Sequence, residues 1–175
     1  MKKCILTFFL LGIVWAQANA QTPKGNILIK NATVITITNG TMENTDVLIQ
    51  DGKIRRIGSD LRTPRGVEEL DATGMFLMPG IIDAHSHIAG SSINEGTSQV
   101  TAEVSMEDVV NPTDVSIYRA LAGGVTSIHL MHGSANVIGG QNETLKLRYG
   151  TLNPDELRFE GAPRTIKFAL GENPT

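Results

Sequence analysis

Cysteine is almost absent from this chain of 175 residues, and its single copy, Cys4, stands before the first apolar run. The pattern of the N-terminal residues indicates that Cys4 is removed during export. A mature chain without cysteine forms no disulfide and uses no thiolate as a metal ligand or nucleophile. The chain also lacks a cluster of basic residues, and its formal net charge is −3. This charge pattern argues against nucleic acid as a partner.

The first 20 residues have the pattern of a secretory signal peptide. Lys2 and Lys3 precede an apolar run over residues 5–14, and Ala18-Asn-Ala20 supplies the small-residue pattern that signal peptidases recognise. The run is too short to span a bilayer, so we expect cleavage after Ala20; a retained membrane anchor is the alternative. The mature protein is then expected to be periplasmic or secreted, and loss of the two lysines would change its net charge from −3 to −5.

Short β-branched runs separated by turn signals extend from Asn26 to about Leu70. Two of the turns have strong signals, Asn39-Gly40 and Asp51-Gly52, and the second lies between two β-branched runs, as in a tight hairpin. Few helix-forming stretches interrupt this region. The pattern predicts a small antiparallel β domain, and by itself it indicates no chemistry.

The pattern changes beyond Asp71, where apolar strands alternate with a helix and polar loops. The expected elements are, in order, a buried strand over 76–83, a helix that begins at Asn111-Pro112 and ends at Gly123-Gly124, a strand over 125–131, a strand over 144–148, a helical turn capped by Asn153-Pro154, and a strand within 163–174. A strand, a helix and a second strand in this order are typical of a parallel sheet, with the functional loops at the carboxyl ends of the strands.

Two histidines, His85 and His87, stand two residues apart at the carboxyl end of the first apolar strand. Residues i and i+2 of a strand point to the same face, so the two imidazoles can hold one cation. Neutral imidazole is a good ligand for zinc and similar ions. A catalytic metal site typically takes three or more protein ligands, so the pair would be half of a site. Two exposed loop histidines are the alternative for such a pair.

Four motifs in a fixed order resemble the metal-dependent amidohydrolase superfamily, in its imidazolonepropionase-like and exported peptidase-like branch. They are Asp51-Gly-Lys-Ile, Asp71-Ala-Thr-Gly, Met78-Pro-Gly-Ile-Ile-Asp-Ala-His-Ser-His and Gly124-Val-Thr-Ser. The resemblance implies an α/β fold, in which a small β-sandwich at residues 21–75 precedes the first strands of a (β/α)8 TIM-like barrel at residues 76–175. It also implies that His85 and His87 are metal ligands on the first barrel strand, for one or two divalent ions, expected to be zinc.

Three further residues are candidates through the same resemblance. Lys167 lies in a strand similar to one that carries a carboxylated, metal-bridging lysine in some members; a solvated lysine is the alternative. His132 and Asn136 belong to a stretch similar to the family's His-Gly-Ser-Ala-Asn and are expected to contact substrate. The alternative for His132 is a structural histidine that is hydrogen-bonded to loop backbone. His129, inside an apolar strand, is expected to pack rather than to take part in chemistry.

The resemblance implies a hydrolase that acts on a carbon–nitrogen bond of a small cyclic amide or a dipeptide through a metal-activated water. The family pattern requires a histidine after the fifth strand, another after the sixth and an aspartate after the eighth, but no histidine follows His132. We therefore expect an N-terminal fragment without a catalytic residue of its own, inactive alone and lacking a C-terminal half-barrel. The alternative is a non-catalytic truncated product or a half-barrel interaction module.

Overall fold

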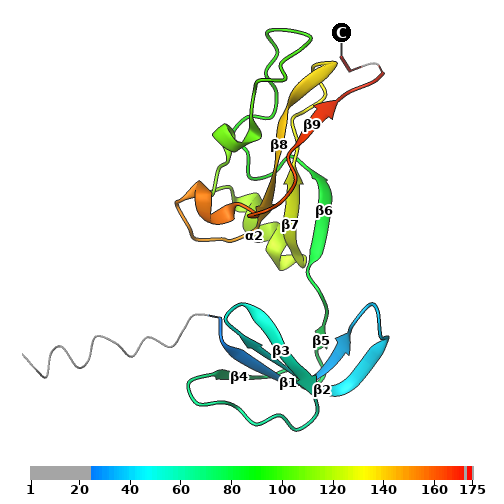
Figure 1. Ribbon diagram of the computed structural model, residues 1–175, viewed down its shortest axis with the longest axis vertical. Helices are drawn as coiled ribbons and strands as arrows, with labels where there is room; N and C mark the ends of the chain where they lie inside the picture. Colours follow the sequence, from blue (N-terminus) through cyan, green and yellow to red (C-terminus); the bar gives the residue numbers. More distant parts are fainter. Residues whose placement is uncertain (1–24, 172, 175) are drawn as a thin grey trace, which may run out of the picture. The chain divides into compact units, whose positions relative to one another are not determined.

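The computed structural model of the protein describes residues 25–171, 173 and 174. The predicted signal peptide, residues 1–20, lies outside the described residues. The chain divides into two compact units, residues 1–79 and residues 80–175, each with its own sheet (Figure 1). Within the described part, none of the helices is long and apolar enough to cross a membrane.

A five-stranded mixed sheet forms the first unit. Its strands are β1 (Ile27–Ile35), β2 (Thr41–Gln50), β3 (Lys53–Gly58), β4 (Glu68–Asp71) and β5 (Phe76–Leu77). They are arranged in the order β3-β2-β1-β4, and β5 also pairs with β1. The neighbours β1, β2 and β3 run antiparallel, as the turn signals predicted, whereas β4 and β5 run parallel to β1. The expectation of a purely antiparallel unit is therefore wrong, because residues 59–67 cross from β3 to the other edge of the sheet instead of forming a tight hairpin turn.

The hairpin between β2 and β3 is the one that the sequence predicted. Asp51 and Gly52 both have positive φ, at 52° and 69°, which is the backbone geometry of a tight two-residue hairpin turn. The flanking residues Gln50 and Lys53 are paired across it. The Asp51 amide also donates to the side-chain oxygen of Asn26 at 2.8 Å, which ties the turn to the start of β1.

The first unit has a small apolar core and a buried carboxylate. One cluster of its buried apolar residues consists of Ala32, Val34, Val47 and Ala72. Asp46 is only 1% exposed, and its two oxygens accept hydrogen bonds from the amides of Asn31 and Leu61, each at 2.9 Å. Residues 25–79 contribute a single sheet, so the second layer of the expected β-sandwich is not among them.

The strand expected over residues 76–83 is two strands in the structure. β5 belongs to the first unit and β6 (Ile81–Ser86) to the second, and Met78-Pro-Gly80 separates them. Pro79 has no amide hydrogen for a strand ladder. Gly80 lies so close to the neighbouring strand that a Cβ there would be 2.0 Å from the Thr126 hydroxyl oxygen. β6 is also less buried than expected, with Ile82 69% exposed, because β7 is its one neighbour among the described strands.

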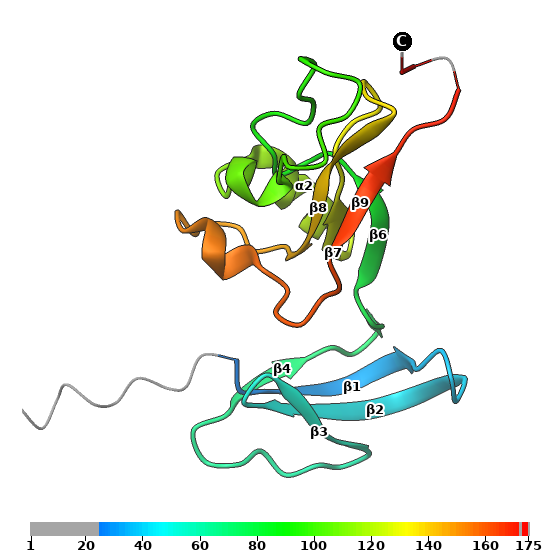
Figure 2. The same cartoon turned by 45° about the horizontal axis from the view of Figure 1, so that its top comes forward.

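A four-stranded sheet with three short helical segments forms the second unit (Figures 1 and 2). Besides β6, its elements are η1 (Met106–Val109), α2 (Val115–Ala122), β7 (Val125–Leu130), β8 (Ile138–Lys146), η2 (Pro154–Leu157) and β9 (Thr165–Phe168). The order is β6-β7-β8-β9, and the parallel β6-α2-β7 arrangement confirms the strand–helix–strand prediction. β8 is antiparallel to both neighbours, unlike the expected parallel sheet, because the short connection of residues 131–137 holds no crossover helix.

Helix α2 begins later than the sequence predicted. Its N-cap is Asp114, whose Oδ1 accepts from the Ser116 amide at 2.8 Å, whereas Asn111 closes only the preceding turn. The other carboxylate oxygen, Oδ2, accepts from the Ala89 amide at 2.8 Å. The expected stop is confirmed, since Gly123 caps the carboxyl end.

The core of the second unit lies against one face of the sheet. Its fully or nearly fully buried apolar residues are Ala89, Met106, Ile117, Ile128, Leu130, Leu145, Leu147 and Leu157. Six of them come from α2, both short 3₁₀ helices and the strands β7 and β8, and Ala89 and Leu147 lie in connecting segments. Successive side chains of a strand point to opposite faces of the sheet. The strand residues that alternate with these core residues therefore lie on the other face, which is polar.

Candidate functional site

The structure places His85 and His87 side by side at the carboxyl end of β6. Their ring centroids are 5.1 Å apart and the ring planes are nearly perpendicular, at 80°. Nδ1 of His87 lies 2.9 Å from the carbonyl oxygen of Met131, which follows β7. If that nitrogen donates to the carbonyl, Nε2 keeps its lone pair, and a backbone partner of this kind commonly orients a metal-binding histidine. The amide of His85 donates to Asp83 Oδ1 at 3.1 Å, which fixes the backbone before the pair.

The two imidazoles suit a divalent ion such as zinc, but they are only part of a coordination sphere. Within residues 25–171, 173 and 174, no group of three or more His, Cys, Asp or Glu side chains is placed to hold a metal. The donor set therefore fits a metal at His85 and His87 as two of its ligands. Their role as ligands stays a prediction.

A row of polar side chains crosses the sheet on the face opposite the apolar core. Nδ1 of His129, on β7, lies 3.0 Å from the hydroxyl oxygen of Thr144 on β8. Nε2 of the same ring lies 2.8 Å from the hydroxyl oxygen of Thr165 on β9. Burial lowers the pKa of His129 below its ordinary value, and the charge of the nearby His85 lowers it further. The sequence predicted that His129 packs within an apolar strand, whereas in the structure its ring links three strands through hydroxyl groups.

Lys167 lies on β9, two residues beyond Thr165 and only 8% exposed. It lines an open pocket of about 420 Å³ together with Ser134, Phe168, Ala169, Leu170, Asn173 and Pro174. The lining of this pocket includes neither predicted metal-binding histidine. This low exposure argues against the alternative that Lys167 is a solvated lysine. The metal-bridging role of Lys167 stays a prediction.

His132 is completely buried, and its amide and both ring nitrogens have hydrogen-bond partners in the protein. Its amide donates to Asn142 Oδ1 at 3.0 Å, and its Nε2 accepts from the Glu95 amide at 3.1 Å. Nε2 accepts and therefore carries no hydrogen, so Nδ1 carries it and donates to the Gly133 carbonyl at 3.0 Å. These bonds favour the structural role that the sequence left open, and a substrate contact of His132 stays a prediction.

Asn136 holds the loop that follows β6. It is fully buried, and its Nδ2 donates to the carbonyl oxygens of Glu95 and Ser98, at 2.5 and 2.6 Å. Its Oδ1 has no hydrogen-bond partner within the described residues. Asn136 and His132 thus bind the same loop, at Glu95, from the connection between β7 and β8. The substrate role of Asn136 also stays a prediction.

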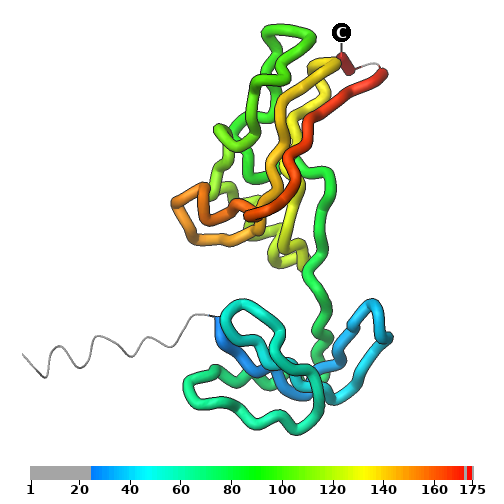
Figure 3. Tube along the Cα trace, viewed as in Figure 1, coloured from blue at the N-terminus to red at the C-terminus, as the bar shows by residue number. Residues whose placement is uncertain are grey.

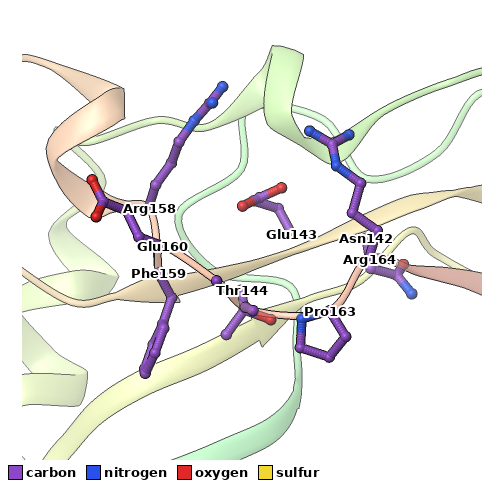
Figure 4. Close-up of a pocket in the computed structure, with 10 residues that line it drawn as sticks. Asn142, Glu143, Thr144, Arg158, Phe159, Glu160, Pro163 and Arg164 are labelled. Carbon is purple, nitrogen blue, oxygen red and sulfur yellow. The ribbon is translucent and has the colours of Figure 1, made fainter.

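Charged residues on the apolar-core side of the sheet form a second cluster that the sequence analysis missed. Glu107 on η1 is paired with Arg158, after η2, and with Arg164, before β9, the latter at 3.0 Å. The two segments can be followed in the trace of Figure 3. Glu143 on β8 lies between the segments that carry the arginines, in a cavity of about 270 Å³ (Figure 4). Burial raises the pKa of Glu143 above its ordinary value, and the charge of Arg164 offsets only part of that effect.

The polar row had a signal in the sequence, whereas the charged cluster had none. Ser127 and His129 alternate with Ile128 and Leu130, which is the period-2 pattern of a strand with one polar face. The cluster joins residues up to 57 positions apart, such as Glu107 and Arg164, and no local pattern indicates such a pairing.

No family model matches the chain, but the comparisons with known proteins found relatives named dihydroorotase, adenine deaminase and amidohydrolase. A solved amidohydrolase from Thermotoga maritima is 43% identical, with a TM-score of 0.77, over 85% of this chain and 40% of that one. A dihydroorotase from Streptococcus pneumoniae is 30% identical over 149 residues, which are 85% of this chain and 32% of the relative. A dihydroorotase from Trichlorobacter lovleyi is 33% identical over 106 residues, which are 61% of this chain and 22% of the relative. The chain thus spans less than half of the length of each of these relatives.

Proposed function

The chain belongs to the metal-dependent amidohydrolase superfamily, a superfamily of hydrolases, and from this membership we propose that it forms part of an enzyme that hydrolyses a carbon–nitrogen bond in a small cyclic amide. The dihydroorotase relatives favour a cyclic amide over a dipeptide. Because the chain spans only 22% to 40% of the length of the three relatives, the activity is proposed for a protein in which further barrel strands accompany this segment.

The observation that carries the proposal is the pair His85 and His87 at the end of β6, with centroids 5.1 Å apart. The carboxyl ends of the strands are where barrel enzymes place their chemistry. The Met131 carbonyl lies 2.9 Å from Nδ1 of His87 and orients the ring; if Nδ1 donates to it, Nε2 keeps a lone pair for a metal. Zinc is the proposed metal, because imidazole nitrogens are among its preferred ligands. The chemistry supplied by such an ion is activation of water and polarisation of the carbonyl under attack.

Lys167 is proposed as a further ligand, through carboxylation of its Nζ by carbon dioxide. The ammonium first loses one proton; the neutral amine then forms a nitrogen–carbon bond to CO2 and releases a second proton, so that a cation becomes an anionic oxygen ligand. Lys167 is only 8% exposed, so its side chain is held within the fold rather than freely solvated, which supports this role. No catalytic acid or base is assigned to the described residues.

The test is a zinc titration of the full chain by calorimetry with a competing chelator. We expect weak binding, because the chain offers two strong ligands and one conditional ligand. His85→Ala and His87→Ala should each lower the affinity at least about tenfold. The matched control is Asp108→Ala, which removes an exposed carboxylate of the same unit and should leave zinc binding unchanged.

Two results would count against this proposal. If His85→Ala binds zinc as tightly as the unmodified chain, the histidine pair is not the metal site. If the chain alone hydrolyses dihydroorotate, and His85→Ala abolishes that activity, the idea that the site needs further strands is wrong.

Export is a separate part of the proposal. It rests on the basic start, the apolar run and the Ala18-Asn-Ala20 pattern of the first 20 residues. Sequencing the N-terminus of the protein recovered after expression with export machinery should give Gln21 as the first residue. Recovery of Met1 from the cytosolic fraction alone would contradict export.

A further inference from the structure

β9 is held in the sheet by few backbone pairs. It has four residues and lies at the edge of the described sheet, where β8 is its neighbour. Its pairing with β8 includes three residue pairs, the outer two of which are Ile138 with Phe168 and Asn142 with Thr165. The register is irregular between Ile138 and Gln141. A short edge strand with an irregular ladder needs side-chain contacts to fix its position.

Thr165 supplies such contacts through its hydroxyl group. Nδ2 of Asn142 donates to Thr165 Oγ1 at 2.9 Å, and His129 Nε2 lies 2.8 Å from the same oxygen. Asn142 is 4% exposed, and its Oδ1 is held by the His132 amide. His129 reaches from β7 across β8 to β9, beyond the pairing of neighbouring strands. The Thr165 hydroxyl is thus fixed from two strands at once.

Lys167 follows Thr165 by two residues, so the two side chains start from the same face of β9. Between the pairs at Gln141 and Ile138, Gly139 and Gly140 oppose the single residue Lys167, which is the arrangement of a β-bulge. A Cβ on Gly139 would lie 3.3 Å from Lys167 Cβ and 2.7 Å from His132 Nδ1. Gly139 therefore makes room for the stem of Lys167 beside the buried His132.

We propose that His129 and Asn142 are positioning residues for Lys167, which they place through the Thr165 hydroxyl opposite the glycine bulge of β8. The positioning of Lys167 follows from the hydrogen bonds and the strand register. The contribution of this positioning to metal binding rests on the proposed function. His129 is thereby assigned a role that neither the metal pair nor apolar packing requires.

The test compares two isosteric variants, Thr165→Val and Thr144→Val, in the full chain. Each removes one hydroxyl partner of His129, but only the first releases β9 from both His129 and Asn142. The readout is the rate at which an amine-acylating reagent modifies Lys167, measured by mass spectrometry against the exposed Lys53 in the same sample. Loss of one or two hydrogen bonds should raise the relative rate at Lys167 about fivefold or more in Thr165→Val. In Thr144→Val the rate should change by less than about twofold.

Three outcomes decide the matter. A selective increase in Thr165→Val, matched by His129→Leu and smaller in His129→Gln, supports the proposal. No increase at Lys167 in Thr165→Val, with unchanged circular dichroism, overturns it. An equal increase in both threonine variants also overturns it, because a general loss of stability would then explain the labelling.

The proposed function is tested separately in the same samples. Incubation with ¹³C-labelled bicarbonate and zinc should give a carbamate NMR signal that Lys167→Ala abolishes. If that signal is absent from the unmodified chain while the labelling result stands, the positioning is supported and the metal-bridging role fails.

Discussion

Replacement of Asp114 by alanine should destabilise the second unit, because one carboxylate holds two parts of it. Oδ1 caps α2 through the Ser116 amide, and Oδ2 accepts from the Ala89 amide, two residues after His87. Loss of a helix N-cap costs about 1 kcal/mol. A hydrogen bond to a charged acceptor contributes about 1.5–3 kcal/mol, and the Ala89 amide belongs to a fully buried residue. The free energy of unfolding should therefore fall by about 2.5–4 kcal/mol in Asp114→Ala and by about 1–2 kcal/mol in Asp114→Asn, which keeps one acceptor.

The effect of this substitution should depend on pH. Burial raises the pKa of Asp114, but hydrogen bonds from the Ser116 and Ala89 amides and the charge of Arg119 outweigh burial and bring it below the ordinary value of 3.8. A lowered pKa in the folded state means that the stabilisation is complete above pH 3.8 and is lost as the pH falls through the folded value. The difference between Asp114→Ala and the unmodified chain should therefore be larger at pH 7 than at pH about 2.5.

Urea unfolding followed by the near-ultraviolet circular dichroism of tyrosine measures this unit. Both tyrosines of the chain, Tyr118 on α2 and Tyr149, lie in the second unit, with ring centroids 5.3 Å apart. Asp108→Ala is the control, because Asp108 is an exposed aspartate of the same unit. The reasoning is refuted if Asp114→Ala costs no more than the control, or if its cost is the same at both pH values.

Two further substitutions, one in each unit, test a buried hydrogen-bond acceptor and a close approach of the backbone. Asp46→Ala removes the acceptor of the Asn31 and Leu61 amides and should lower the free energy of unfolding of the first unit by about 2–4 kcal/mol in urea titrations; an unchanged midpoint would contradict this. Gly139→Ala places a Cβ 2.7 Å from His132 Nδ1 and should destabilise the second unit by about 1–3 kcal/mol. The measurement is the melting temperature, which should fall; a melting temperature equal to that of the unmodified chain would show that the β-bulge accommodates the added methyl group.

Features that depend on neighbouring residues were predictable from the sequence. The Asp51-Gly52 hairpin follows from the positive φ that both residues tolerate in a tight turn. The proximity of His85 and His87 follows from the period of a strand, and the end of α2 follows from the glycines at its carboxyl end. Each of these signals is contained in a few consecutive residues, so no knowledge of the rest of the fold is needed.

Other features depend on partners that are distant in the sequence, and the predictions for them were incomplete or wrong. His129 was assigned to packing, although its partners Thr144 and Thr165 lie 15 and 36 residues away. The apolar composition of residues 76–83 predicted one strand. In the structure these residues form parts of two strands, one in each sheet, separated at Pro79 and Gly80. The direction of β8 depends on a loop too short for a crossover, which strand propensity does not reveal.

The sequence by itself determined the superfamily, the histidine pair and the presence of a β domain before a βαβ unit, because local periodicity and turn chemistry encode them. Only the tertiary structure shows that both ring nitrogens of His132 are hydrogen-bonded to backbone groups, and that Lys167 is buried opposite the glycine bulge. Burial and hydrogen bonding are properties of the assembled sheet, so a residue's availability for chemistry is settled only when its distant neighbours are in place.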